Sequence, residues 1–494
     1  MMNKCPRFRD VRYIRLTVFK HLLGIGLLLC ASFSTADYNS SDNLPDLGDV
    51  TASRYSAQQE HDLGRMWLKM FRSRVKTVDD PLMQDYIESL LYKLVSNSEL
   101  KDRRLETVVV DNPTINAFAV PGGVIGVHSG LFLNTDNEAQ LAGVLAHEIA
   151  HISQRHFTRS LDKSAQSTIP TLAGLLAGVV LAATAGADAG IAAITATQAA
   201  ALDSQLRFSR QNEQEADRLG METLAKSGMD PNAVPAMFEN MGKNLRYARS
   251  KPPEFLLTHP LTDSRVSDSK NRARQYPRKV YTDNLNYQLM KMRATLFHSN
   301  NAEDLLKNWS GTNSVNGEAH RYGVVIALIK LERWDEAAQK LAPLLEDDGQ
   351  RIAYRIAEAD ILIGKKEYDK AIAMLSNQLA ITPGNNPYTM ELAQVFQEAN
   401  RYNEADILLS RQSQERPDDP NLWYQLAEVR GLAGNILGVH LARAEYFILV
   451  GQFERAKQQL RYGYERTGNN HIEQSRIRQR LKDIADMEEK LKRL

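Results

Sequence analysis

The stretch LAGVLAHEIAHISQRH (Leu141–His156) contains two histidines four residues apart, His147 and His151, with Glu148 directly after the first. Its apolar residues recur at helical spacing, which predicts an α-helix. Positions i and i+4 of a helix lie on one face, so both imidazoles can reach the same ion. Zinc prefers such ligands, and a glutamate beside a zinc-activated water can act as general base. The stretch therefore predicts half of a zinc peptidase site, since H-E-x-x-H seldom arises by chance.

Two histidines do not complete a catalytic zinc site, so a third protein ligand must come from elsewhere in the chain. A metzincin would have glycine at position 154 and histidine at position 157, but Gln154 and Phe157 stand there. His156 lies five residues after His151 and off the ligand face, so we expect it to have a structural role or to contact a ligand from outside the coordination sphere. The acidic segment RQNEQEADRLG (Arg210–Gly220) remains as the source of the third ligand.

Two carboxylates of this acidic segment, Glu213 and Asp217, lie four residues apart and would share one face of a helix, whereas Glu215 would point elsewhere. One of the pair can bind zinc while the other accepts a hydrogen bond from a ligand histidine, as metal sites generally require. A solvated, charged helix face would have the same spacing. Taken alone, these residues leave both interpretations open.

The segment Glu106–Phe132, which precedes the H-E-x-x-H helix, is rich in β-branched residues and is interrupted at 112–113 and 121–123 by proline and glycine. This composition predicts short strands separated by turns. An extended peptide can pair with an exposed strand edge, so Asn116–Val120 or the strand after Gly123 could hold a substrate. A plain turn explains the glycines equally well.

The C-terminal part of the chain contains a repeat, visible in the segments RWDEAA, EYDKAI, RYNEAD and QFERAK. Their alanines are spaced 34, 34 and 51 residues apart, and Pro383 and Pro417 are also 34 residues apart. This period is typical of tetratricopeptide repeats, which usually bind another protein in a concave groove. The longer last interval predicts an extra helix between Leu422 and Ala444. The repeated aromatic residues and alanines are Trp334, Ala337, Tyr368, Ala371, Tyr402, Ala405, Phe453 and Ala456.

Three motifs together resemble the gluzincin family of the CAAX prenyl proteases and the bacterial heat-shock membrane protease. They are H-E-x-x-H, the later E-x-x-x-D that begins at Glu213, and N-A-F-A-V-P-G-G (Asn116–Gly123) before both. The resemblance covers roughly residues 50–270 and implies a zinc endopeptidase with one zinc ion per chain. It implies that Glu213 is the third zinc ligand and that Asp217 is the family's matching aspartate.

The same family often carries a His-Pro pair at the distance of His259, which lies in THPLTDSR (Thr258–Arg265). His259 could stabilise the transition-state oxyanion, or it could occupy the open zinc position and keep the enzyme latent. A histidine in a surface loop explains the residue equally well. Arg265 could contact the acidic residues of the site.

The first 36 residues combine a basic lead, an apolar run from Leu22 to Phe33 and the small residues Ser34–Ala36, which is typical of a cleaved signal peptide. An uncleaved anchor and a lipid anchor at Cys30 are the alternatives. Both cysteines, Cys5 and Cys30, lie in this leader, so we expect no disulfide or thiol catalysis in the mature protein. The formal charge of +1 argues against a nucleic-acid binder. These features predict export, to the periplasm if the source is Gram-negative.

Residues 164–202 carry a single charge, that of Asp188, and are dominated by alanine, glycine and threonine. These residues are only weakly hydrophobic, so we favour a helical hairpin packed on the catalytic domain over a membrane span. Such a hairpin could make a peripheral membrane contact. A true span there would instead indicate a prenyl-type membrane protease.

We therefore predict a mainly α chain in which an α+β zinc metalloprotease domain is followed by an α-solenoid of tetratricopeptide repeats. The predicted segments are a signal peptide (1–36), the protease domain (45–270), a linker (271–300) and the repeats (301–494). The resemblance implies misfolded or stalled outer-membrane proteins as substrates and the outer-membrane β-barrel assembly machinery as the partner of the repeats, with a chaperone-like role. The alternative is a chaperone or adaptor whose zinc site is latent.

Overall fold

The structure is a computed structural model that describes residues 56–163, 210–247, 254–311 and 317–493. All of these belong to one compact unit, Ser53–Leu494. The predicted signal peptide over residues 1–36 and the predicted hairpin over residues 164–202 lie outside the described residues. Within the described stretches, no helix is both long enough and apolar enough to cross a membrane.

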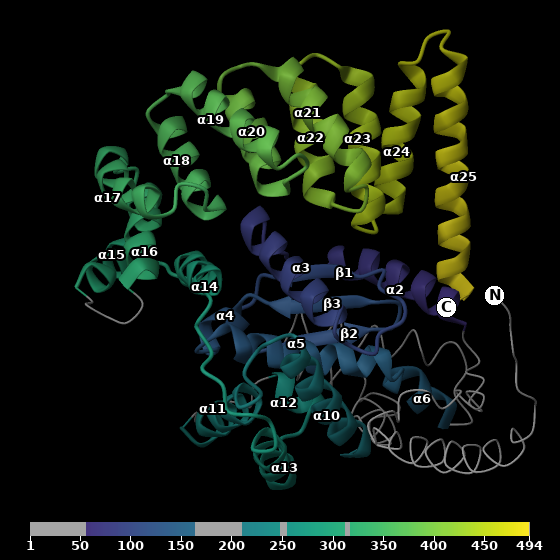
Figure 1. Cartoon of the computed structure of the whole chain (residues 1–494). Helices are drawn as coiled ribbons and strands as arrows, with labels where there is room; N and C mark the ends of the chain where they lie inside the picture. Colours follow the sequence, from purple (N-terminus) through teal and green to yellow (C-terminus); the bar gives the residue numbers. More distant parts are fainter. Residues whose placement is uncertain (1–55, 164–209, 248–253, 312–316, 494) are drawn as a thin grey trace, which may run out of the picture. The chain divides into compact units, whose positions relative to one another are not determined.

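Three strands form one sheet (Figure 1). β1 (Glu106–Val110) runs parallel to β3 (Val124–His128), and β2 (Ala117–Val120) runs antiparallel to β3, so the strand order is β1-β3-β2. The prediction of strands is confirmed. Because β3 is paired on both sides, the strand after Gly123 is not an edge, and that suggestion for a substrate site was wrong. Within the described residues β2 pairs with β3 alone, so it is an edge strand.

The turn between β2 and β3 depends on two glycines. Gly122 has φ of 85° and Gly123 has φ of 78°, which is the left-handed region that glycine adopts at no steric cost. A Cβ atom on Gly122 would lie 2.3 Å from the backbone oxygen of Glu60 in the neighbouring helix. These glycines therefore have a structural role in the turn.

Helices surround this sheet, and their bounds are α2 (Ala57–Arg72), α3 (Pro81–Val95), α4 (Gly130–Asn134), α5 (Glu138–Ser153), α6 (His156–Lys163), α10 (Arg210–Lys226), α11 (Ala233–Tyr247), α12 (Glu254–Thr258) and α13 (Asp263–Ala273). The predicted H-E-x-x-H helix is α5, and it packs against α3, α10, α11 and β2. Its N-cap residue Asn137 accepts a hydrogen bond from the Gln140 backbone, which satisfies one free donor of the first turn.

Close contact between α5 and α10 brings the two predicted halves of the site together. Every residue of α5 from Gln140 to His151 is buried, so the helix is covered on all sides. A Cβ atom on Gly220 of α10 would lie 3.0 Å from the backbone nitrogen of His147. Glycine at this position therefore lets α10 approach the backbone of α5 beside the first histidine.

The rest of the described chain is helical: α14 (Leu285–Phe297), α15 (Ala302–Ser310), α16 (Gly317–Lys330), α17 (Trp334–Asp347), α18 (Ile352–Gly364), α19 (Tyr368–Ile381), α20 (Asn386–Glu398), α21 (Tyr402–Glu415), α22 (Pro420–Leu432), α23 (Ile436–Leu449), α24 (Phe453–Glu465) and α25 (His471–Arg493). Each predicted aromatic residue begins a helix, and each repeated alanine is fully buried. Two helices, α22 and α23, separate α21 from α24, so the predicted extra helix is present. The predicted fold class is confirmed.

Residues 271–300, which we predicted as a linker, contain α14. This helix packs against α3, α4 and α16, and the hydroxyl of its Tyr287 donates to the backbone oxygen of Thr135 at 2.7 Å. The segment therefore takes part in the core. The boundaries of the individual domains stay a prediction.

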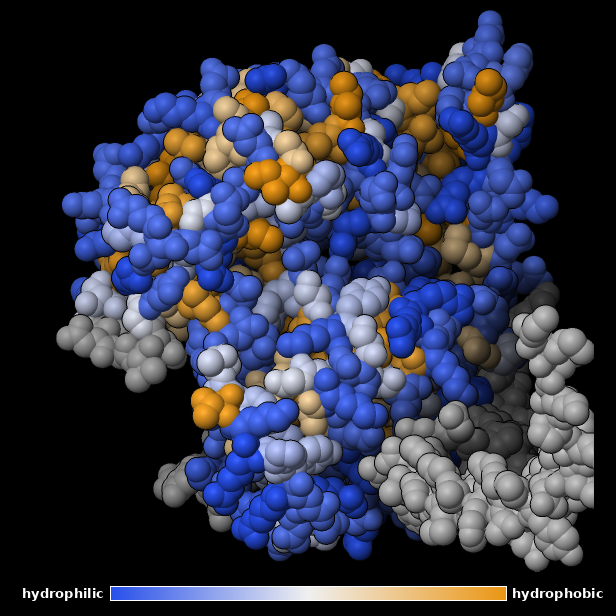
Figure 2. Space-filling model, in the orientation of Figure 1, coloured by the Kyte–Doolittle hydropathy of each residue, from blue (hydrophilic) through white to orange (hydrophobic). Residues whose placement is uncertain are grey.

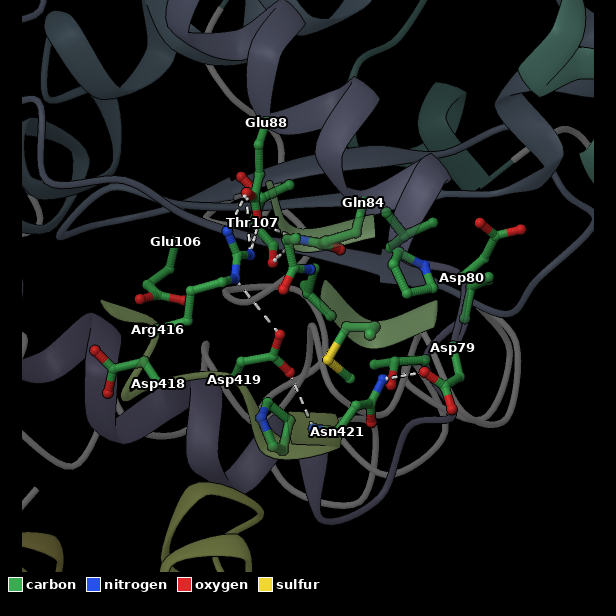
Figure 3. A pocket seen from close by; sticks show the side chains of 18 of the residues that line it. Asp79, Asp80, Gln84, Glu88, Glu106, Thr107, Arg416, Asp418, Asp419 and Asn421 are labelled. Carbon is green, nitrogen blue, oxygen red and sulfur yellow. Dashed lines mark hydrogen bonds and ion pairs between the residues drawn. The ribbon is translucent and has the colours of Figure 1, made fainter. Parts of the chain in front are cut away.

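The repeats contact the sheet-containing part through α3 and the turn between α21 and α22 (Figure 3). Arg416 donates to both carboxylate oxygens of Glu88, at 2.8 and 3.1 Å. The side-chain amide of Asn421 donates to Asp79 at 2.8 Å. These residues line a cavity of about 290 Å³ that also includes Glu106 of β1.

Candidate metal centre

The residues predicted from α5, α10 and the segment after α12 meet in one buried cluster. His147, His151, Glu213 and His259 each offer one ligand atom, and these four atoms lie within 4.8 Å of one another. All four side chains are buried. Asp217 is buried as well, so the alternative of a solvated helix face for α10 was wrong.

Two imidazole nitrogens and one carboxylate converge on the same point. Nε2 of His147 is 3.0 Å from Nε2 of His151, and Oε1 of Glu213 is 3.4 Å from the latter nitrogen. Oε2 of Glu213 is 3.5 Å from Nε2 of His147. Although burial by itself raises the pKa of Glu213, the surrounding imidazoles hold it well below its usual range. The carboxylate is therefore ionised and available as a ligand.

Asp217 and Arg265 support His147 on the side of its ring that faces away from the cluster. Oδ1 of Asp217 is 3.0 Å from Nδ1 of His147, and Arg265 donates to both oxygens of Asp217 at 2.7 Å. Although burial lowers the pKa of His147, hydrogen bonds to Asp217 and Glu213 raise it to about 9. The expected contact of Arg265 with the acidic residues is present, and Arg265 also lies 2.8 Å from Oε2 of Glu213. A carboxylate in this place fixes the ring orientation of a metal-binding histidine.

Glu148 lies beside the cluster but outside its set of ligand atoms. Its side chain is buried, and its Oε1 has no hydrogen-bond partner among the described residues. Burial raises the pKa of Glu148, and the backbone of Ala119 in β2, which lies close to its carboxylate, acts in the opposite direction. Glu148 therefore lies between the cluster and the edge strand, and the raised pKa makes it a stronger base than a solvated carboxylate.

His259 is in contact with the cluster and with Glu148 at the same time. Its Nδ1 lies 3.0 Å from Oε1 of Glu213 and 3.3 Å from Nε2 of His147. Its Nε2 lies 3.4 Å from Oε1 of Glu148, and its ring stacks on Phe255. The side chain is 2% exposed, so the alternative of a surface-loop histidine was wrong.

His156 and Glu215, which the sequence placed off the ligand faces, lie next to each other at the back of the cluster. Nδ1 of His156 is 3.0 Å from Nδ1 of His151, and Nε2 of His156 is 3.0 Å from Oε2 of Glu215. The expectation that His156 contacts a ligand from outside matches this geometry. The contact of Glu215 was missed, because its position on a helical wheel does not show which helix lies opposite.

Comparisons with known proteins agree with this geometry. The model of peptidase family M48 matches residues 81–273, and a tetratricopeptide repeat model matches residues 362–429. The chain is 34% identical to the β-barrel assembly-enhancing protease of Escherichia coli (strain K12), over 95% of this chain and 96% of that protein. This chain belongs to peptidase family M48.

Other relatives cover either nearly the whole chain or about a third of it. The β-barrel assembly-enhancing protease of Yersinia pestis is 33% identical over 97% of this chain and 99% of that protein. A mitochondrial metalloendopeptidase of Arabidopsis thaliana is 32% identical over 33% of this chain and 31% of that protein. The expected resemblance is thereby confirmed, and the chain is a metalloprotease that carries tetratricopeptide repeats.

The donor set of the cluster fits the metal of such an enzyme. Two neutral imidazoles and one carboxylate are the ligands that catalytic zinc uses in other peptidases of the gluzincin type. Burial lowers the pKa of His151 well below its usual range, which keeps that imidazole neutral and able to bind a metal. His147, whose pKa is raised to about 9, would release a proton when a metal binds. Among the described residues, His147, His151, Glu213 and His259 form the group whose ligand atoms could hold a zinc ion, and neighbouring side chains hydrogen-bond to them.

Proposed function

We propose that this chain is a zinc-dependent endopeptidase of the periplasm that degrades misfolded or stalled outer-membrane proteins. The observation that carries the proposal is the convergence of His147, His151 and Glu213 on one point, with the buried base Glu148 beside it and the edge strand β2 next to that base. One zinc ion per chain would be held by those three side chains.

The residues of the site would divide the work of peptide hydrolysis. When bound, zinc supplies a Lewis acid that polarises a carbonyl and makes water more acidic. Glu148 accepts the proton of the attacking water and returns it to the leaving amine. Asp217, held by Arg265, keeps the ring of His147 in the orientation that presents Nε2.

β2 would hold the substrate as an added strand. It pairs with one strand only among the described residues, and its Ala119 lies close to the general base. An extended client segment that paired with this edge would place its backbone beside Glu148, and recognition through the backbone suits an enzyme that takes unfolded chains of many sequences.

His259 would keep the resting site latent. Its ring contacts a metal ligand and the general base at once, so it occupies the space that a water and a substrate carbonyl need. If this is its role, His259→Ala raises casein cleavage. If His259 instead stabilises the transition state, cleavage falls, and an unchanged rate disposes of both roles.

The repeats would bring clients or the assembly machinery to the protease. Figure 2 shows that apolar residues are more frequent on the repeat helices, in the upper part of the view, than on the part below them. Among the exposed apolar side chains of the repeats are Ile381, Ile407 and Ile472. The names of the full-length relatives refer to β-barrel assembly, which supports outer-membrane proteins as clients and a chaperone-like role of the repeats.

Metal content and casein cleavage of the purified mature chain test the proposal. We expect one zinc per chain, and we expect Glu148→Gln to cleave about 10²- to 10⁴-fold more slowly with its zinc content unchanged. Glu222→Gln, on α10 and paired with Lys226, is the matched control that keeps full activity. Equal cleavage by wild type and Glu148→Gln would overturn the proposed mechanism.

A chaperone or adaptor with a latent zinc site is the alternative function. The contact of His259 with the cluster is the observation that favours it. Complementation of a deletion strain separates the two functions, because the alternative predicts that Glu148→Gln restores outer-membrane protein assembly as well as the wild type does.

A further inference from the structure

A chain of contacts runs outward from His151 on the side away from the metal cluster. Nε2 of His151 faces the cluster, and its Nδ1 lies 3.0 Å from Nδ1 of His156. The two rings are nearly perpendicular, at 76°. Nε2 of His156 then lies 3.0 Å from Oε2 of Glu215, and the His156 side chain is fully buried. Two imidazoles and a carboxylate therefore stand in line.

These contacts allow one arrangement of protons. A neutral histidine that binds a metal through Nε2 carries its proton on Nδ1. Nδ1 of His151 then donates to Nδ1 of His156, which has to accept, so the proton of His156 is on its Nε2. That proton points at Glu215, which is an acceptor. Each hydrogen bond depends on the next, and the carboxylate at the end of the line decides the tautomer of both rings.

We propose that His156 and Glu215 are a positioning pair that fixes the tautomer and the ring orientation of the metal ligand His151. The inference rests on the proposed role of His151 as a zinc ligand. Neither residue of the pair touches the metal or the substrate, and both act through His151.

The backbone around His156 and the hydrogen bonds of the neighbouring residues hold this ring in place. Arg155, between α5 and α6, has φ of 50°, a left-handed conformation that is unfavourable for a non-glycine residue. Its guanidinium donates to Glu60 of α2 at 2.8 Å, and Thr158 donates to the same carboxylate oxygen. These bonds stabilise the bend that turns His156 back under His151.

The two candidate ligand histidines have different supports, and both supports come from α10. His147 contacts the carboxylate of Asp217 directly, whereas His151 reaches that of Glu215 through an intervening imidazole. Glu213 lies between these two carboxylates in the sequence and faces the cluster itself. One helix therefore supplies the candidate third ligand and the outer support of the other two.

Zinc affinity, measured on the full chain by competition with a chromophoric chelator, tests the pair. His156→Phe keeps a buried ring but removes the acceptor, and we expect it to weaken zinc binding about 10- to 100-fold. We expect Glu215→Gln, which keeps an acceptor oxygen and loses the charge, to have a smaller effect in the same direction. Glu222→Gln on the same helix is the matched control and should bind zinc as the wild type does.

A spectroscopic signature separates positioning from general support of the fold. In the Co²⁺-loaded chain, an imidazole N–H proton on a metal-bound ring gives a hyperfine-shifted resonance when a hydrogen bond protects it from exchange. We expect the wild type to show such resonances for His147 and His151, and His156→Phe to lose only that of His151. His156→Asn, whose side-chain oxygen can take the place of Nδ1, should restore part of the zinc affinity.

The outcomes distinguish this inference from the proposed function. A wild-type chain that binds no zinc would overturn the proposed function and the inference with it. A wild-type chain that binds zinc, together with a folded His156→Phe variant of equal affinity and both resonances, would overturn the inference alone. If His156→Phe does not fold, Glu215→Gln decides by the same measurements, and an affinity equal to that of Glu222→Gln counts against the pair.

Discussion

The metal cluster and the repeats differ in the kind of side chain that they bury. In the cluster the buried groups are ionisable and come from distant positions, such as His147 and His259, which are 112 residues apart. In the repeats most of the buried groups are small or apolar, such as Ala371 and Leu375 on the same helix. Each repeat needs only its neighbours, whereas the cluster needs several elements in place at once. Changes in the cluster should therefore alter the chemistry as well as the stability, while changes in the repeats should alter the stability alone.

Metal removal should have the largest effect, because it removes both the Lewis acid and the stability that metal binding adds. Chelation is expected to abolish casein cleavage and to lower the free energy of unfolding by about 4 kcal/mol when zinc had been present at a thousand times its Kd. Urea unfolding with and without chelator measures the change, and added zinc should restore the first curve. Identical unfolding curves with and without chelator, together with retained casein cleavage, would contradict the expected role of a metal in the cluster.

Overpacking a repeat should reduce stability and leave the chemistry intact. Ala371 of α19 is fully buried, so Ala371→Leu is expected to cost about 1–3 kcal/mol of unfolding free energy. Ala373 is exposed on the same helix, and Ala373→Leu is the matched control with little expected effect. Casein cleavage per folded molecule should be unchanged in both variants. A large loss of cleavage in Ala371→Leu without unfolding would show that the repeats and the cluster are coupled.

The contact between the repeats and α3 should contribute least to the free energy of unfolding. Arg416 makes a bidentate pair with Glu88 of α3, and both side chains are partly exposed (Figure 3). Arg416→Ala is therefore expected to cost about 1 kcal/mol or less, and the loss should shrink at high salt because the pair is screened. Arg411→Ala, exposed on α21, is the control. Urea midpoints at low and high salt measure both, and equal midpoints for the two variants would remove this pair from the interface.

Predictions from local pattern were accurate where one element decided the outcome. The helix of His147 and His151, the strands on both sides of Gly122, and the helices that begin with the repeated aromatic residues are all present. These patterns are decided within one element, since helical spacing decides which side chains share a face. The 34-residue period likewise needs no knowledge of distant residues.

Contacts between elements could not be predicted from the sequence pattern alone. Spacing grouped Glu213 with Asp217 and set Glu215 aside, but all three take part in the site because α6 turns back and brings His156 to Glu215. The predicted linker contains a packed helix, α14, whose buried residues include Leu289, Met290 and Met292, and only the packing of α14 against α3, α4 and α16 shows that it belongs to the core.

Residue spacing along the chain indicated much of the chemistry available to this protein, namely two histidines and a glutamate on one helix and a repeat typical of protein-binding surfaces. The family resemblance added Glu213 as the third ligand. Tertiary structure alone decided that His259 is buried against Glu148, that β2 is the edge strand beside it, and that His156 lies behind His151. The physical reason is that side-chain direction along a helix follows from residue spacing. The approach of one helix to another depends on the packing of every side chain between them.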